Sequence, residues 1–222
     1  MLLLFDIDGT LLQQASREHA ESLLIALERV HGVRPPEGKL DAAGRTDLDI
    51  ARMLLLNAGV SAERIDAGAD DVRAITIEEY AQRCPNDLSG HLAPDAADVV
   101  HALSEDERFL LSLVTGNLEP VARLKLQRAG IGHYFATGQG GFGSDHEDRT
   151  ELPPIARARA GGWAREQTVV IGDTPRDIAC ARADGVAVIA VPTGPYDRFA
   201  LREADAVIDR LGELPEALAS LA

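Results

Sequence analysis

The amino-acid sequence predicts an α/β fold: a doubly wound, mostly parallel sheet that carries an inserted unit of α-helices. Two observations support this prediction. Short apolar runs alternate with helical patterns in the second half of the chain, as happens when helices connect parallel strands. The long stretch between the first two apolar runs is itself helical in pattern, so it is predicted to be a second domain rather than a loop.

The strands are predicted from runs of apolar residues without polar alternation. This pattern is typical of strands that are buried on both faces of a parallel sheet. The runs are Leu2–Phe5, Phe109–Val114, Thr168–Ile171, Val186–Val191 and Ala206–Ile208.

Helices are predicted between the later strands from apolar residues at helical spacing. Glycine follows three of these helices, as is common after the last turn, and Pro94-Asp95 offers a start for the first. The predicted helices of this part are Ala96–Leu103, Val121–Ala129, Pro153–Ala160 and Asp177–Ala183.

The inserted unit is predicted from helical segments that follow the first strand. Turn residues such as Pro35-Pro36, Gly44 and Gly59 separate them. We therefore expect residues 13–89 to form a helical domain, and residues 1–12 and 90–222 to form the α/β core. The helical segments are Arg17–Val30, Leu48–Ala58, Ala62–Gly68 and Val72–Arg83.

Composition narrows the class of partner. The 222 residues include 22 Lys and Arg against 36 Asp and Glu, a formal charge of −14, which opposes binding to nucleic acid and to anionic membranes. No apolar run is long enough to span a membrane, and the run before Asp6 is too short for a signal peptide. Cys84 and Cys180 lack the spacing of a zinc site or a disulfide framework. We expect a cytoplasmic protein, a monomer or a homodimer.

The first candidate site is Asp6-Ile7-Asp8-Gly9-Thr10, at the predicted end of the first strand. Ligand sites in open α/β sheets lie at the carboxyl ends of the strands. Two carboxylates two residues apart point to the same face of a strand and repel each other unless a cation or a proton intervenes. The pair suits a nucleophile, Asp6, beside a general acid and base, Asp8. The motif alone leaves a polar turn open as the alternative.

Two other strand ends carry polar residues. Thr115-Gly116-Asn117 follows the second apolar run, and a hydroxyl with successive backbone N–H groups can hold phosphate oxygens. Asp173 follows the third run, and Asp177 opens the next helix, where an acid is also favoured by the helix dipole.

Taken together, these segments resemble in order and spacing the motifs of the haloacid dehalogenase-like (HAD) hydrolase superfamily. The likeness is to its phosphatase branch with a helical cap, similar to phosphoglycolate phosphatases, and it covers residues 1–12 and 90–193. The resemblance implies a Rossmann-like core, a mobile cap and Mg²⁺-dependent hydrolysis of a small phosphorylated metabolite through an aspartyl-phosphate.

The resemblance also implies roles for single residues. Asp6 would attack phosphorus, and Asp8 would protonate the leaving oxygen and then activate water. Thr115, Gly116 and Asn117 would bind phosphoryl oxygens. The implied ligands of Mg²⁺ are Asp6, the backbone carbonyl of Asp8, and Asp173, with Asp177 as an additional acid.

The basic residue departs from the family pattern, which usually has a lysine followed by a proline before the helix that precedes the last motif. Arg149 stands at this position, and a guanidinium can bind phosphate through two N–H groups. The alternative is Lys125, which lies within the predicted helix Val121–Ala129 and is expected on its solvated face. We therefore predict that Arg149 is the phosphate-binding cation.

Three further patterns give weaker signals. Arg45, in Gly44-Arg45-Thr46, resembles a stretch of related caps that faces the active site, so it is predicted to contact substrate; an exposed helix start is the alternative. The segment 138–143 matches G-x-G-x-x-G, but a polar loop follows it, so dinucleotide binding is not predicted. His146, near the proposed site, is expected to be a solvated loop residue.

Three alternative functions stay open. A sugar phosphomutase of the same superfamily would share every motif. A 2-haloacid dehalogenase would share Asp6 but normally lacks the acid at Asp8. A catalytically silent binding protein would keep the fold. The sequence does not identify the substrate, because substrate choice depends on the cap, where no specific motif is present.

Overall fold

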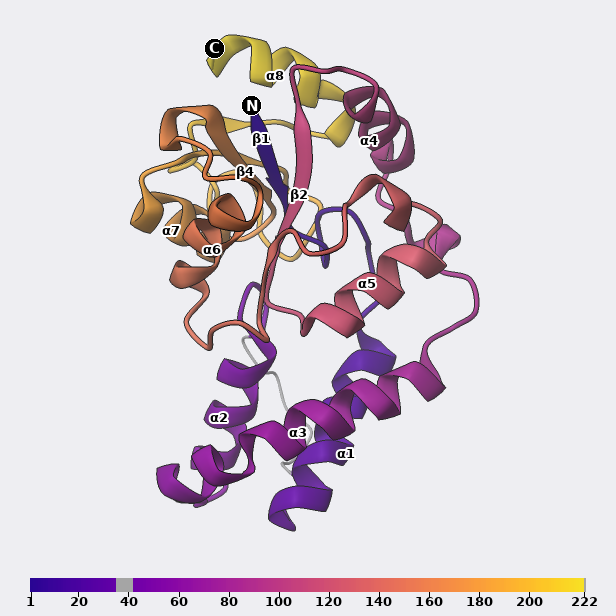
Figure 1. Ribbon diagram of the computed structural model, residues 1–222, viewed down its shortest axis with the longest axis vertical. Helices are drawn as coiled ribbons and strands as arrows, with labels where there is room; N and C mark the ends of the chain where they lie inside the picture. Colours follow the sequence, from indigo (N-terminus) through magenta and orange to yellow (C-terminus); the bar gives the residue numbers. More distant parts are fainter. Residues whose placement is uncertain (35–41, 222) are drawn as a thin grey trace.

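The computed structural model describes residues 1–34 and 42–221, which form a six-stranded sheet in the order β3-β2-β1-β4-β5-β6. All neighbouring strands are parallel, and β1 lies between β2 and β4 (Figure 1). The predicted doubly wound α/β fold is confirmed. The strands are β1 (Leu2–Phe5), β2 (Leu110–Thr115), β3 (Gly141–Phe142), β4 (Thr168–Gly172), β5 (Ala187–Ala190) and β6 (Ala206–Val207).

Helices cover both faces of the sheet because successive side chains of β1 point to opposite faces. Leu3 and Phe5 pack with residues of α4, α5 and α8, whereas Leu2 and Leu4 pack with residues of α6 and α7. The helices of the core are α4 (Ala96–Ser104), α5 (Glu119–Arg128), α6 (Leu152–Arg159), α7 (Pro175–Asp184) and α8 (Leu214–Leu221).

The inserted helices, here called the cap, are α1 (Arg17–His31), α2 (Asp47–Asn57) and α3 (Ala62–Arg83). They lie beyond the carboxyl end of β1, opposite to the end that holds the N-terminus (Figure 1). The cap has a hydrophobic cluster of its own, which includes Leu27 and Leu55. The division at residues 13 and 89 stays a prediction.

The helix α3 differs from the prediction, which placed separate helices at Ala62–Gly68 and Val72–Arg83. It is one helix of 22 residues. Gly68 lies where α3 packs on α1, and a Cβ there would be 2.8 Å from Cε1 of His31. This glycine therefore permits close helix packing and does not end the helix.

Two elements were absent from the prediction. The strand β3 has two residues, one of them glycine, so it forms no apolar run. The helix α8 has eight residues, and its Leu214, Leu218 and Leu221 do recur at helical spacing, so this signal was present in the sequence and was missed. Within residues 1–34 and 42–221, no helix combines the length and the apolar character that crossing a membrane requires.

Candidate active site

The carboxyl ends of three strands bring the predicted polar segments together. Asp6 follows β1, and its backbone N–H donates to the carbonyl of Ile171 in β4 at 2.9 Å. Thr115 is the last residue of β2, and Asp173 follows β4 directly. Because parallel strands end at one edge of the sheet, residues far apart in sequence converge here.

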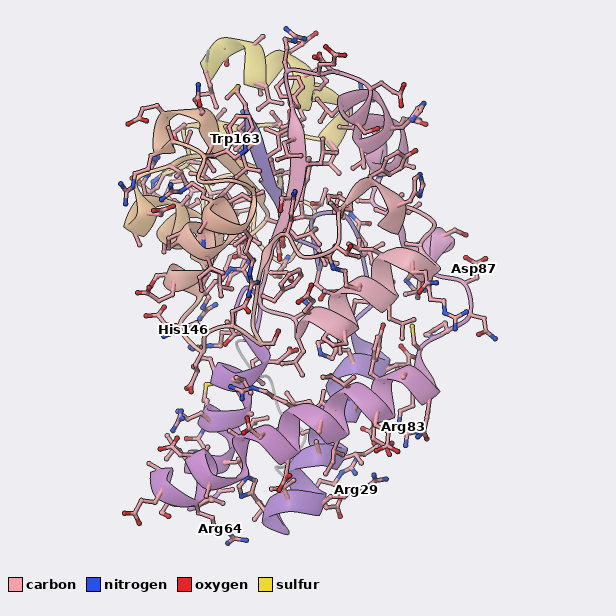
Figure 2. The ribbon with its side chains drawn as sticks, viewed as in Figure 1. Arg29, Arg64, Arg83, Asp87, His146 and Trp163 are labelled. Atoms are coloured by element: carbon pink, nitrogen blue, oxygen red, sulfur yellow. The ribbon has the colours of Figure 1, made fainter. Side chains whose placement is uncertain are left out.

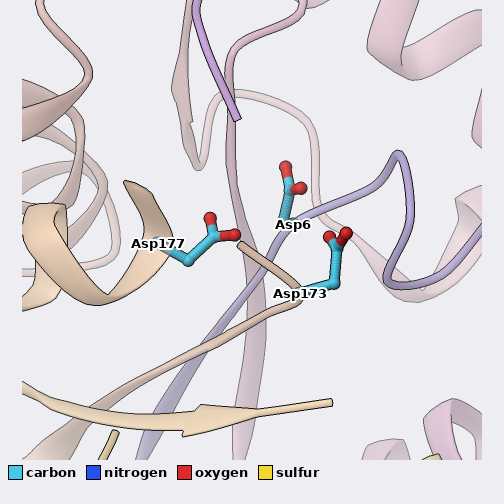
Figure 3. Close-up of side chains that lie close together, drawn as sticks. All are labelled: Asp6, Asp173 and Asp177. Carbon is cyan, nitrogen blue, oxygen red and sulfur yellow. The ribbon is translucent and has the colours of Figure 1, made fainter. Parts of the chain in front are cut away.

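Asp6, Asp173 and Asp177 form a buried acid cluster at this edge (Figure 3). One carboxylate oxygen from each lies within 4.8 Å of the others. Burial raises the pKa of Asp6 to about 7, Arg149 opposes the rise, and repulsion from Asp177 adds to it. Burial raises the pKa of Asp173 to about 8, with repulsion from Asp177 and Asp6 adding to it. A cation within the cluster would relieve this repulsion.

The side chain of Asp173 is suited to bind a cation. Its Oδ1 accepts a hydrogen bond from Oγ1 of Thr10 at 2.9 Å. Its Oδ2 is buried and has no hydrogen-bond partner among the described residues. Gly9, at φ 95°, leaves space for this oxygen, because a Cβ at position 9 would lie 2.2 Å from it. A buried carboxylate oxygen without a donor is the hard ligand that Mg²⁺ takes, so the donor set fits a divalent cation.

Arg149 supplies positive charge to the cluster from a short 3₁₀ turn, Arg149–Glu151. Its Nη2 lies 3.1 Å from Oδ1 of Asp6 and donates to Oδ1 of Asp177. Burial opposes the charge of Arg149, but Asp177 and Asp6 hold its pKa well above the usual value. The other oxygen of Asp177 accepts from the backbone N–H of Thr174 at 2.9 Å, in the capping box that starts α7. Asp177 thus fixes the guanidinium relative to Asp6.

The carboxylate of Asp8 has a different environment. Nζ of Lys125 donates to Oδ1 at 2.8 Å and to Oδ2 at 2.6 Å, and Nδ2 of Asn117 donates to Oδ2 at 2.8 Å. Burial acts to raise the pKa of Asp8, but the charges of Lys125 and His19 and these hydrogen bonds lower it to about 2. The surroundings therefore shift the pKa values of Asp6 and Asp8 in opposite directions.

The expectation that Lys125 lies on a solvated helix face is wrong, because its side chain is 0% exposed. It comes four residues after Val121 and four before Ala129, which are both buried, and helical spacing places the three on one face. Arg149 and Lys125 both reach the site, the first at Asp6 and the second at Asp8. That Arg149 fills the basic position of the family stays a prediction.

The sequence reasoning missed two buried residues of the cap, His19 and Asp47. Nδ1 of His19 lies 3.2 Å from Nζ of Lys125, and its Nε2 lies 3.0 Å from Oδ2 of Asp47. This oxygen of Asp47 also accepts from the backbone N–H of Leu118, at the start of α5, at 2.8 Å. A buried chain of contacts thus connects the cap to Asp8.

A cavity of about 700 Å³ lies between the cap and the carboxyl edge of the sheet. Thr115 and Asp177 are fully buried and do not line this cavity, but Oγ1 of Thr115 accepts from Nδ2 of Asn117, a lining residue, at 3.0 Å. The other predicted site residues line the cavity itself: Asp6, Asp8, Arg45, Gly116, Asn117, Arg149 and Asp173.

The cap touches the core at Gly116. A Cβ on this residue would lie 2.0 Å from the carbonyl oxygen of Arg45, so glycine is required for the contact. The backbone N–H of Asp47 donates to the carbonyl of Gly116 at 2.9 Å. Oγ1 of Thr46 donates to the carbonyl of Glu147 at 2.5 Å. These contacts place the backbone of Arg45 at the cavity. That Arg45 contacts the substrate stays a prediction.

The other two weaker patterns of the sequence are His146 and the glycine-rich segment 138–143. His146 is exposed, as expected, and lies on the loop near the cap (Figure 2), with Nδ1 3.2 Å from the carbonyl of Asp148. The glycine-rich segment 138–143 contains β3 and is followed by turns rather than by a helix. It therefore lacks the strand–glycine–helix order of a dinucleotide site.

Known protein families provide an independent comparison. The model of the family described as haloacid dehalogenase-like hydrolase matches residues 3–182. The chain belongs to this family. A second model, described as HAD-hydrolase-like, matches residues 151–214. The resemblance noted in the sequence is confirmed.

Relatives of similar length align over almost the whole chain. A phosphoglycolate phosphatase of Mesorhizobium japonicum is 28% identical, with 98% of this chain and 94% of the relative covered. "Probable phosphatase IndB" of Dickeya dadantii is 26% identical, with 96% and 91% covered. Among solved structures, β-phosphoglucomutase of Clostridium difficile shares the fold, with a TM-score of 0.70, 14% identity, and 99% of this chain and 96% of that chain covered.

Proposed function

We propose that this HAD-like hydrolase is a cytoplasmic, Mg²⁺-dependent phosphatase that cleaves a small phosphorylated metabolite through an aspartyl-phosphate at Asp6. One observation carries the proposal. Asp6 lies beside a buried guanidinium and two buried acids, while Asp8, two residues away, is held separately by Lys125. The nucleophile needs a cation beside it, and the proton carrier must be kept apart from the nucleophile. The two environments meet these two requirements. The names of the relatives support phosphate-ester chemistry.

The proposed ligands of the metal are Asp6, Asp173 and the backbone carbonyl of Asp8. Mg²⁺, when bound, screens the repulsion between an anionic carboxylate and an anionic phosphate. Both carboxylate oxygens of Asp177 already have partners in Arg149 and Thr174. Its proposed part is therefore to orient Arg149, so that the guanidinium neutralises both Asp6 and a phosphoryl oxygen.

Asp8 is proposed to carry the proton. In the free protein its carboxylate is ionised. A phosphate dianion brings like charge next to it, which raises a carboxylate pKa and favours uptake of the proton that the leaving oxygen then receives. The ionised form next takes a proton from the water that hydrolyses the aspartyl-phosphate. Thr115, Gly116 and Asn117 would bind the phosphoryl oxygens during both steps.

A sugar phosphomutase is the second candidate, because it would use the same residues and a phosphomutase shares this fold. The two functions differ in the fate of the phosphoryl group. A mutase returns it to a sugar and accumulates a bisphosphate, whereas a phosphatase releases inorganic phosphate. The acid at position 8 argues against a dehalogenase, which normally lacks it. Partners other than the substrate are not proposed, and the chain would act as a monomer or a homodimer.

The test is release of inorganic phosphate from an aryl phosphate and a panel of metabolite phosphates. We expect turnover with Mg²⁺, a rate that is about tenfold or more lower in EDTA, and recovery of the rate when Mg²⁺ is added in excess. Asp173→Asn should raise the Mg²⁺ concentration needed for half-maximal rate. Folded protein that releases no phosphate from any member of the panel with Mg²⁺ would overturn the proposal.

A further inference from the structure

We infer that the cap selects phosphate esters whose organic group is apolar and uncharged; this inference rests on the proposed phosphatase function. The selecting surface, here called the apolar wall, is the part of the cavity formed by the cap helices. It consists of Ala20, Leu23 and Leu24 from α1, and Ile50 and Leu54 from α2.

The apolar wall is built from one face of each helix. Ala20 and Leu24 are four residues apart in α1, and Ile50 and Leu54 are four residues apart in α2, so each pair projects in one direction. Leu24, Ile50 and Leu54 are only partly buried, although they line a cavity within the protein. Apolar carbon left uncovered inside a cavity can be covered by an apolar ligand group, which stabilises the complex.

The wall shares one cavity with the acid cluster. Asp6, Arg149 and Asp173 line the same space of about 700 Å³, which is within the usual range for small-molecule sites. A phosphoryl group bound at Asp6 would therefore direct its organic group into a space whose cap side carries the apolar wall, beside polar residues that include Gln14, Ser16 and His19. The volume also leaves room for a group larger than a two-carbon acid.

The charges on the cap side do not favour a second anion. Among the described residues, Arg45 is the one arginine or lysine that the cap contributes to the cavity lining, and its Nη1 forms an ion pair with Asp49 at 2.6 Å. The lining histidine of the cap, His19, lies 3.0 Å from Asp47. A carboxylate placed against leucine and isoleucine loses its hydration without a new partner, which is costly. The substrate class should therefore differ from phosphoglycolate, which carries such a carboxylate.

The experiment compares matched phosphate esters with the intact protein and Mg²⁺. One series is the n-alkyl phosphates from ethyl to hexyl, and the other ends each chain in a carboxylate. We expect kcat/KM to rise by about threefold to fourfold per methylene in the alkyl series. Each carboxylate ester should be about tenfold or more below the alkyl ester of equal length.

Variants show whether the wall causes this selectivity. Leu54→Asn should flatten the rise with chain length, so that kcat/KM falls more for the hexyl ester than for the ethyl ester. Leu56→Asn is the matched control, because Leu56 lies on the same helix but is 47% exposed and does not line the cavity; it should keep the full slope. A flat alkyl series in the unmodified protein, or a preference for the carboxylate esters, would overturn the inference. Failure of the proposed function is distinct, since no ester at all would then be hydrolysed.

Discussion

Asp6→Asn is expected to lower kcat by about 10⁴-fold or more, because the amide cannot attack phosphorus. The substitution changes one oxygen to nitrogen and leaves the size of the side chain unaltered. Steady-state assays with an aryl phosphate and Mg²⁺ measure the loss. A variant that kept Mg²⁺-dependent turnover near the original rate would show that Asp6 is not the nucleophile.

The same substitution should not destabilise the protein in EDTA at pH 8. The pKa of Asp6 is raised to about 7 by burial and by repulsion from the other acids, against the pull of Arg149. A carboxyl group whose pKa is raised in the folded protein destabilises the folded state once the pH exceeds the ordinary pKa of that group. The destabilisation reaches its full size above the raised pKa. We therefore expect an unchanged or higher Tm for the asparagine variant, so that activity and stability move in different directions. A large fall in Tm would instead trace the lost activity to misfolding.

Lys125→Met is expected to lower kcat by about 10²-fold and the free energy of unfolding by roughly 3 kcal/mol. Methionine has a similar length but leaves Asp8 without its ammonium partner. The lowered pKa of Asp8 means that its carboxylate stabilises the native state at neutral pH, a contribution lost as the pH falls from about 4 to about 2. Urea unfolding at pH 7 and steady-state kinetics measure the two effects.

Two controls separate this ion pair from general damage to α5. Gln127→Met alters an exposed position two residues further along the same helix and should leave both quantities nearly unchanged. In an Asp8→Asn background, Lys125→Met should cost much less stability than in the original protein, because the partner charge is already gone. Equal costs in the two backgrounds would mean that Lys125 does not act through Asp8.

Much of the fold could be predicted because its signals are local. The buried run Leu2–Phe5 and the other apolar runs mark the central strands, and Asp6 and Asp173 follow two of them directly. Convergence at the edge of the sheet then follows from parallel pairing alone. The exception, β3, is held in place by its neighbour β2 rather than by an apolar run of its own.

The environment of Asp8 could not be predicted so readily, because it depends on contacts between distant elements. Lys125 comes from α5 of the core and His19 from α1 of the cap. A partial signal was present: His19 lies four residues before Leu23, and Lys125 lies four after Val121, so both occupy apolar helix faces. Periodicity thus indicates that these residues are buried, but only the tertiary structure shows which charge each one meets.

The close contact between α1 and α3 has a consequence for the response of the cap to acid. His31 lies at this contact beside Gly68, and both of its ring nitrogens are buried without a hydrogen-bond partner among the described residues. Burial, with the charge of Arg64, lowers the pKa of His31. Since the unfolded chain then binds the proton more readily, acidification below the usual histidine pKa of about 6.5 is expected to lower the free energy of unfolding. The helix α1 also carries part of the apolar wall, so the buried imidazole links the stability of the cap to pH on the helix that shapes the cavity.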